Sequence, residues 1–372
     1  MQKVLNISDS PIAFYFQRQS ATINEFLGSA CWRYYYDDYR MHGCQHFLDL
    51  ANFSTRDEVM TVLEESDCYI FHATRNYRRP LFCRDGVIRT SEYPEGKTEF
   101  VLIHGQPETL EIPRTNLFIK RHANHLRFLV ATPNQLDVFP GTQLFPIVGQ
   151  FKATDAPYLP RPDYLMQSSD VRIIRRSEWK AATVTTMLLK ELGAKKLLPR
   201  LTLRRKLLSH ARRMARKADQ VTLPQMEVAI ARRGLQITLD NRTYWQDLFD
   251  VLGDVRASDV LLENEWRDYP GGGCNHTIGM EAMSMGVACF NGMTKRNAAR
   301  LSEWLGADSL PPLPNWEDEA DYQKRFMQYM RSLIYDQDSL TEAKRASRQF
   351  FLDWLDAPNV VPRVIGQLEA AS

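Results

Sequence analysis

The chain has 372 residues, which is longer than one hydrophobic core usually organises, so its length predicts two domains. Its 47 lysine and arginine residues nearly balance its 45 aspartate and glutamate residues, and the formal net charge is +2. This balance excludes an argument for nucleic-acid or membrane binding from overall charge, so only local basic clusters can support one.

Cysteine usage and apolar runs indicate the compartment. The six cysteines form no Cys-x-x-Cys pair, and we expect reduced thiols rather than a disulfide framework or a zinc site. No apolar run reaches the roughly 20 residues that span a bilayer. The first residues lack the charged and apolar regions of a signal peptide. We therefore expect a cytoplasmic protein.

The first half of the chain alternates strand-like and helical patterns. Strands are expected at residues 3–8, 46–50, 68–73, 99–105, 127–132 and 144–149. Helices are expected at residues 23–32 and 55–67, the second opened by Ser54 or Thr55. Strands and helices in alternation indicate a parallel sheet flanked by helices.

Residues 152–163 read KATDAPYLPRPD, a polar stretch with several prolines that is typical of an interdomain linker. The alternation then resumes. Strands are expected at residues 171–177, 225–233, 235–240, 258–264 and 286–291, although residues 225–233 also fit a helix. Helices are expected at residues 181–192 and 244–254, around residues 280–285, and over most of the last fifth of the chain. Two such domains in tandem leave a cleft, where ligands bind outside the carboxyl ends of the strands.

The stretch YPGGGCNHTIGMEAMSMGVACF, residues 269–290, combines a glycine loop with a helix and a strand-like exit. Thr277 or Asn275 can cap a helix that starts near Ile278, and the free amides of such a helix start suit a phosphate group. Glu281 would lie on the first turn, where its carboxylate can accept hydrogen bonds from the two hydroxyls of a ribose. The alternative is a structural turn in which the helix dipole favours Glu281.

The sequence HTIGMEAMSMGVACF resembles the EAMA-x-G-x-P signature of GT-B glycosyltransferases, particularly the retaining enzymes that use nucleotide sugars. The resemblance implies that Glu281 contacts the ribose of the donor. It also implies that the preceding loop contacts the diphosphate through Gly272, Gly273, Asn275, His276 and Thr277. Two departures leave the sugar undetermined, because Gly273 stands where the family often has a second glutamate and Ala288 where it usually has proline.

Two further segments resemble parts of this family. VRIIRRSEWKAAT is similar to the segment that opens the second domain, which implies that Arg175 or Arg176, with Lys180, holds the diphosphate. EFVLIHGQPE is similar to a strand end that carries a histidine, which implies a catalytic role for His104 in contacting the transferred sugar or orienting the acceptor. A solvated basic turn and a structural histidine are the respective alternatives.

The resemblance implies an α/β protein with two Rossmann-like, doubly wound domains that face a cleft. Residues 1–153 would form the acceptor-binding domain and residues 164–345 the nucleotide-sugar-binding domain. Residues 346–372 would form C-terminal helices that pack back on the first domain.

The implied reaction is attack by an acceptor hydroxyl on the anomeric carbon of a nucleotide diphosphate sugar such as a UDP-sugar. Helix amides and basic side chains can stabilise the departing diphosphate, so we expect no cofactor besides this co-substrate and no metal site. In a retaining enzyme the departing phosphate oxygen can take the acceptor proton. An inverting enzyme would need a base, for which His104, Asp9, Asp37 and Asp38 are the candidates.

Three basic clusters in the sequence give evidence on the chemical class of the acceptor. Lys195–Lys217 contains ten basic residues and no acidic one, and it fits a solvated helix, a membrane-surface segment or a phosphate-backbone contact. Residues 75–84 and 118–128 are basic with interleaved aromatics, and they give Arg78, Arg79, Lys120 and Arg121 as acceptor candidates.

These clusters favour a polyanionic acceptor. The acceptor is then either a cell-envelope saccharide or lipid-linked glycan, with the enzyme peripheral to the membrane, or a hydroxylated base in DNA, including phage DNA in a host cytoplasm. A nucleotide-sugar epimerase and a non-catalytic nucleotide-sugar-binding protein are the alternatives. Glu281 packed inside a protein interior would argue against the whole arrangement.

Overall fold

The protein is described here from a computed structural model. The structure describes residues 4–7, 55–74, 77–103, 111–145, 153–154, 156–167, 170–175, 182–194, 224–231, 237–243, 248–262, 277–290, 295–306 and 319–371. The strand expected at residues 46–50 and the helix expected at residues 23–32 lie outside these ranges.

The chain divides into two compact units. The first unit comprises Met1–Lys152 together with Trp354–Ser372, and the second comprises Ala153–Asp353. The first unit is therefore made of two separate stretches of the chain, and its last stretch is almost entirely helix α13 (Ala357–Ala371).

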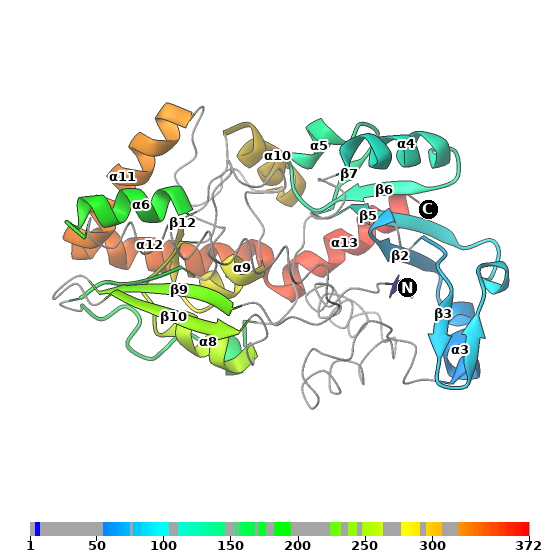
Figure 1. Ribbon diagram of the computed structural model, residues 1–372, viewed down its shortest axis with the longest axis horizontal. Coiled ribbons are helices and arrows are strands. Elements are labelled where there is room, and N and C mark those ends of the chain that lie inside the picture. Colours follow the sequence, from blue (N-terminus) through cyan, green and yellow to red (C-terminus); the bar gives the residue numbers. More distant parts are fainter. Residues whose placement is uncertain are drawn as a thin grey trace. The chain divides into compact units, whose positions relative to one another are not determined.

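The first unit is built on a parallel five-stranded sheet (Figure 1). Its strands, in spatial order, are β1 (Val4–Ile7), β2 (Cys68–His72), β5 (Thr98–Ile103), β6 (Arg127–Val130) and β7 (Gln143–Leu144). The helices are α3 (Arg56–Glu65), α4 (Ile112–His122), α5 (Gln135–Val138) and the short 3-10 helix η5 (Thr90–Glu92). A separate antiparallel hairpin joins β3 (Leu81–Cys83) and β4 (Gly86–Ile88). The parallel pairing confirms the α/β class expected from the sequence.

Local sequence explains why α3 begins where it does. The Thr55 side chain accepts a hydrogen bond from the Glu58 amide at 3.3 Å, and the Glu58 carboxylate accepts one from the Thr55 amide at 2.8 Å. This reciprocal pair satisfies two amides that have no partner inside the helix. Thr55, and not Ser54, is therefore the helix cap.

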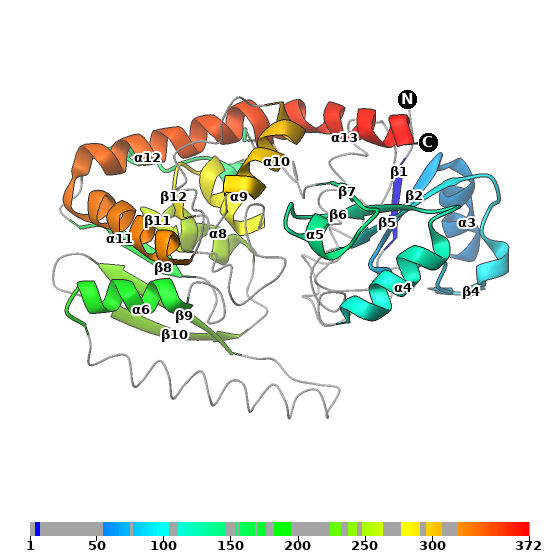
Figure 2. The same ribbon diagram turned by 90° about the horizontal axis from the view of Figure 1, so that it is seen from above.

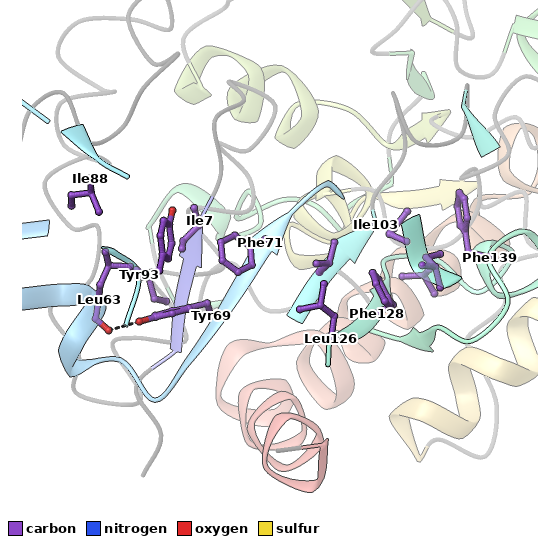
Figure 3. Packing of buried hydrophobic residues seen from close by; sticks show 14 of the residues in the cluster. Ile7, Leu63, Tyr69, Phe71, Ile88, Tyr93, Ile103, Leu126, Phe128 and Phe139 are labelled. Atoms are coloured by element: carbon purple, nitrogen blue, oxygen red, sulfur yellow. Dashed lines mark hydrogen bonds between the residues drawn. The ribbon is translucent and has the colours of Figure 1, made fainter. Parts of the chain in front are cut away.

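One hydrophobic cluster of the first unit lies on the face of the sheet that carries Tyr69 and Phe71 (Figure 3). Both side chains are fully buried, and their rings meet edge to face with centroids 6.2 Å apart. The Tyr69 hydroxyl donates a hydrogen bond to the Leu63 carbonyl at 2.7 Å, which ties the end of α3 to the sheet. Aliphatic and aromatic burial drives this packing, and the buried hydroxyl of Tyr69 has a hydrogen-bond partner.

The second unit contains a mixed sheet in the order β10 (Ile237–Thr243), β9 (Pro224–Ala231), β8 (Arg172–Arg175), β11 (Val260–Leu262) and β12 (Ala288–Phe290). The sheet is parallel from β8 to β12, but β9 pairs antiparallel with both β8 and β10. The second sheet is therefore mixed, and the short connection between β9 and β10 in the sequence fits a hairpin.

Helices cover both faces of the second sheet. They are α6 (Ala182–Glu191), α8 (Leu248–Arg256), α9 (Thr277–Ser284), α10 (Lys295–Leu305), α11 (Glu319–Tyr335) and α12 (Gln337–Phe350), with a 3-10 helix η6 (Ala156–Tyr158) before the sheet. Figure 1 shows α6 and α11 on one side of the sheet and α8 on the other. Successive strand residues point to opposite faces, so Ile173, Val260 and Leu262 pack with buried residues of α6 and α11.

The C-terminal helix completes the first unit. The chain passes from α12 through a π-helical turn (Phe351–Leu355) into α13 (Figure 2). Gln367 Nε2 donates to the Leu144 carbonyl at 2.8 Å, and Arg127 Nε donates to the Ala371 carbonyl at 3.3 Å. The boundary between the units thus falls inside the π-helical turn. None of the helices in the described ranges has both the length and the apolar character needed to cross a bilayer.

Candidate functional site

Two parallel strands of the second unit end side by side where the predicted donor site begins. β8 ends at Arg175 and β11 ends at Leu262, and these two residues are register partners. Leu262 also pairs with Phe290, the last residue of β12. Ligands of open α/β sheets bind beyond the carboxyl ends of parallel strands. The register therefore brings the end of β8 and the end of β11 to one edge of the sheet.

Helix α9 connects that edge with the opposite one. It begins at Thr277 and ends at Ser284, and β12 then starts at Ala288, which pairs with Val260 at the beginning of β11. Because the helix runs antiparallel to the strands, its first amides face the carboxyl edge, where an anion would gain from the helix dipole. The eight residues of α9 span about 12 Å at 1.5 Å per residue.

The placement of Glu281 differs from the expectation. Helix α9 begins at Thr277, one residue before Ile278, and Glu281 lies on its second turn rather than its first. The side chain has no exposed surface, like those of its neighbours Met280 and Ala282. This burial counts against a carboxylate that reaches a ribose without any rearrangement, and residues 263–276 before the helix lie outside the described ranges. The ribose role of Glu281 stays a prediction.

Most of the other predicted site residues are outside the described ranges. These are His104, Arg176, Lys180, Gly272, Gly273, Asn275 and His276, together with the alternative bases Asp9, Asp37 and Asp38 and the basic segment Lys195–Lys217. For Arg175 and Thr277 the structure describes the backbone, as the last residue of β8 and the first of α9. The structure thus brings two of the predicted segments to one edge and does not test their side chains.

Of the acceptor candidates, Arg78 is held in an ion pair. Its Nε lies 2.8 Å from Glu99 Oε1, and Tyr77 donates to the other carboxylate oxygen at 3.2 Å. Glu99 is only 6% exposed and the Arg78 side chain is 32% exposed, so the pair is partly buried. Burial, followed by the charge of Glu99, raises the pKa of Tyr77 to about 12. Arg79 is exposed, and its carbonyl accepts a hydrogen bond from Tyr93.

Lys120 and Arg121 lie on the last turn of α4, shortly before β6 begins at Arg127. The turn is therefore at the edge where the strands start, opposite to the carboxyl ends at which this architecture binds ligands (Figures 1 and 2). Both side chains are exposed. His122 follows them, and burial, then His125 and Arg121, lower the pKa of its imidazole. The sequence analysis did not identify helix α4, which carries these charges and runs back across the sheet.

A buried ionic cluster, which the sequence analysis did not identify, surrounds Asp259. Asp259 Oδ1 lies 2.5 Å from Lys344 Nζ and 2.8 Å from Arg161 Nη2, and its Oδ2 accepts the Arg172 amide at 2.7 Å. Asp259 and the Lys344 side chain are only 2% and 3% exposed. Burial lowers the pKa of Lys344, although the charge of Asp259 opposes that effect. We call Asp259, Lys344 and Arg161 the ionic cluster. Its members are far apart in the chain, so no spacing signal marks them.

Within the described ranges no three histidine, cysteine, aspartate or glutamate side chains gather as a metal-ligand group. Cys68, Cys83 and Cys289 are free, buried thiols. Burial, assisted by Asp67, raises the pKa of the Cys68 thiol to about 12, so this side chain is inert near neutral pH.

Comparison with solved structures identifies the architecture. The crystal structure of Anabaena Alr3699/HepE in complex with UDP-glucose matches over 100% of both chains, with a TM-score of 0.51 and 10% sequence identity. The chain has the GT-B fold. This fold accounts for two α/β units in one chain and for a final helix that returns to the first unit, both of which the resemblance implied.

Another solved structure matches with a lower score. It is an alpha-glucosyltransferase in complex with UDP-glucose and DNA containing an abasic site, with a TM-score of 0.44, 11% identity and 84% and 83% of the two chains covered. No protein-family model matches the sequence, and no curated protein matches it.

Proposed function

We propose that the protein is a glycosyltransferase that moves a sugar from a nucleotide diphosphate sugar, most simply a UDP-sugar, to an acceptor hydroxyl. The observation that carries the proposal is the full-length match to a GT-B structure that contains UDP-glucose. The pairing of Arg175 with Leu262 supports it, because β8, which precedes the basic segment in the sequence, and β11, which precedes the glycine loop, end at the same edge of the second sheet. The EAM-type sequence at Glu281 adds the link to nucleotide-sugar enzymes.

The main catalytic demand is to stabilise negative charge on the departing diphosphate. We assign this task to the first amides of α9, which begins at Thr277, and to the basic residues Arg175, Arg176 and Lys180. Fixed amides and cations act without reorganisation when the charge develops, which makes them effective in a dry site. The proposal includes no cofactor besides the nucleotide sugar.

We propose a retaining outcome. In that course the acceptor oxygen forms a bond to the anomeric carbon on the face from which the diphosphate departs, and the acceptor proton passes to the departing phosphate oxygen. No protein base is then required. His104, at the end of the segment that continues β5, would contact the transferred sugar or orient the acceptor. A determination of the anomeric configuration in the product distinguishes this outcome from inversion.

For the acceptor we propose a cell-envelope saccharide or lipid-linked glycan, or a hydroxylated base in DNA. Arg79 is exposed, and Arg78 pairs with Glu99. Lys120 and Arg121 lie at the far edge of the first sheet and would guide a polyanion rather than contact the reacting hydroxyl.

The first experiment is a calorimetric and thermal-shift panel of nucleotide diphosphates and their sugars. We expect selective binding of one UDP-sugar, followed by its consumption with a hydroxylated-DNA or glycan acceptor. Glu281→Gln should weaken donor binding roughly ten- to hundredfold, because hydrogen bonds to a charged group contribute about 1.5–3 kcal/mol. Glu342→Gln, an exposed glutamate on α12, is the matched control and should leave Kd unchanged.

The outcomes separate the alternatives. Absence of any nucleotide-sugar binding would refute the proposed function. Binding without turnover would indicate a binding protein, and interconversion of the free sugar nucleotide an epimerase. Unchanged donor affinity in Glu281→Gln would show that the buried Glu281 carboxylate does not contact the donor, and it would leave the donor site to the helix amides and basic residues.

A further inference from the structure

Part of the predicted linker is fixed to the second unit. Helix η6 contacts α8, and Tyr158 within it is 3% exposed. Arg161 donates to the Ala257 carbonyl at 3.1 Å and pairs with Asp259. We call residues 156–167 the strap. Its prolines suggest a flexible linker, but the Arg161 side chain binds Ala257 and Asp259, which directly precede β11.

The strap also holds a side chain of α12. Lys344 Nζ donates to the Tyr164 carbonyl at 2.9 Å and to Asp259 at 2.5 Å. Arg161 reaches the same Asp259 oxygen, so one carboxylate joins the strap, the start of β11 and α12. A buried ion pair that loses a partner leaves an uncompensated charge, which makes such a junction resistant to displacement.

The ring of Tyr164 lies directly over the turn that ends α9. Gly286 in that turn has φ +72°, and a Cβ built on it would lie 2.4 Å and 2.5 Å from Cδ2 and Cε2 of the Tyr164 ring. The contact therefore requires glycine both for its backbone conformation and for its lack of a side chain. Arg348 of α12 also donates a hydrogen bond to the carbonyl of Ser284, which is the last residue of α9. The strap and α12 together hold the C-terminal end of α9.

We propose that the strap is a clamp that sets the position of α9, with Tyr164 and Lys344 as positioning residues for the nucleotide-sugar site at the other end of that helix. This inference rests on the proposed function for its catalytic consequence. The strap, the ionic cluster and α9 all belong to the second unit.

A short helix transmits such positioning well. Eight residues of α9 move as one rod of about 12 Å, so a shift at Gly286 is carried to the amides at Thr277. Misplacement of a binding group by about 1 Å can cost on the order of 100-fold in rate. The clamp therefore acts through geometry, at a distance from any group that touches the donor.

The test compares clamp variants with a control of similar stability. Tyr164→Ala and Lys344→Met remove the ring and the ammonium group, whereas Tyr164→Phe keeps the ring over Gly286. Met330→Ala is the control, because Met330 is fully buried in the cluster with α6 and does not belong to the strap or to α9. Isothermal calorimetry with UDP-glucose gives Kd at a temperature where circular dichroism shows each variant folded. Hydrogen exchange of the peptide 277–285 reports on α9 itself.

We expect Kd to rise about tenfold in Tyr164→Ala and Lys344→Met and to stay at the wild-type value in Tyr164→Phe and Met330→Ala. Exchange of residues 277–285 should quicken only in the first two variants. An equal Kd rise in Met330→Ala, or unchanged exchange in both clamp variants, would overturn the clamp. If the wild-type protein binds no nucleotide sugar, the proposed function fails, and the exchange data alone still decide whether the strap fixes α9.

Discussion

The hydrogen bond between Tyr69 and Leu63 offers a quantitative test of the first unit's core. Tyr69→Phe removes one hydroxyl from a side chain with no exposed surface, and it leaves the Leu63 carbonyl without the donor that lies 2.7 Å away. Loss of a buried hydrogen-bond partner costs about 1–3 kcal/mol. The ring and its edge-to-face contact with Phe71 stay in place, so no cavity contributes to the change.

Urea unfolding followed by circular dichroism measures the loss of stability, and hydrogen exchange of peptides from β2 and β11 assigns it to one unit, since the two units can unfold separately. Tyr93→Phe is the control, because the Tyr93 hydroxyl donates to the Arg79 carbonyl in a partly exposed position and should cost about 0.5–1.5 kcal/mol. A loss below about 0.5 kcal/mol in Tyr69→Phe, or a loss confined to the second unit, would refute the reasoning.

Three further results are expected. The Cys68 thiol keeps its proton in the folded state well above pH 9, so its contribution to the unfolding free energy should fall by about 1.4 kcal/mol per pH unit between about pH 9 and pH 12, and the difference between urea titrations of the wild type and of Cys68→Ala should show that slope. Glu99→Gln leaves the partly buried Arg78 guanidinium without its anion, so it should lower the unfolding free energy by about 1–3 kcal/mol in the same urea titration. An unchanged urea midpoint would contradict the pairing. Arg331→Ala breaks an exposed pair with Glu191 and should change stability by less than about 1 kcal/mol, and a larger change in calorimetric Tm would show that the pair is shielded.

Local signals in the sequence were sufficient to predict the helices and strands whose ends depend on neighbouring residues. Thr55 and Glu58 form a capping box that is visible in the sequence, and the apolar run at β5 marks a buried strand. Helix α4 was missed because its exposed face carries Arg114, Lys120 and Arg121, and only Thr115 and Ile119 are buried. So few buried apolar positions give only a weak helical periodicity, and the basic residues of residues 118–128 are the stronger signal in the sequence.

The candidate site was predictable only in part. The register that pairs Arg175 with Leu262 follows from two strands that the sequence marks, so their convergence could be expected. The second-turn position and complete burial of Glu281 depend on how α9 packs against α8 and α12, which no short motif encodes. The ionic cluster joins Arg161, Asp259 and Lys344 across most of the second unit, and only tertiary structure brings them together.

The return of α13 to the first unit has a consequence for synthesis on the ribosome. The Gln367 side chain donates to the Leu144 carbonyl in β7, and the Arg127 side chain at the start of β6 donates to the Ala371 carbonyl. Both strands therefore contact residues that are translated after the second unit. The first unit therefore lacks helix α13 until the second unit has been synthesised. Nascent chains stalled before α13 should expose the surface that this helix covers, and a separately supplied peptide of residues 354–372 should restore it.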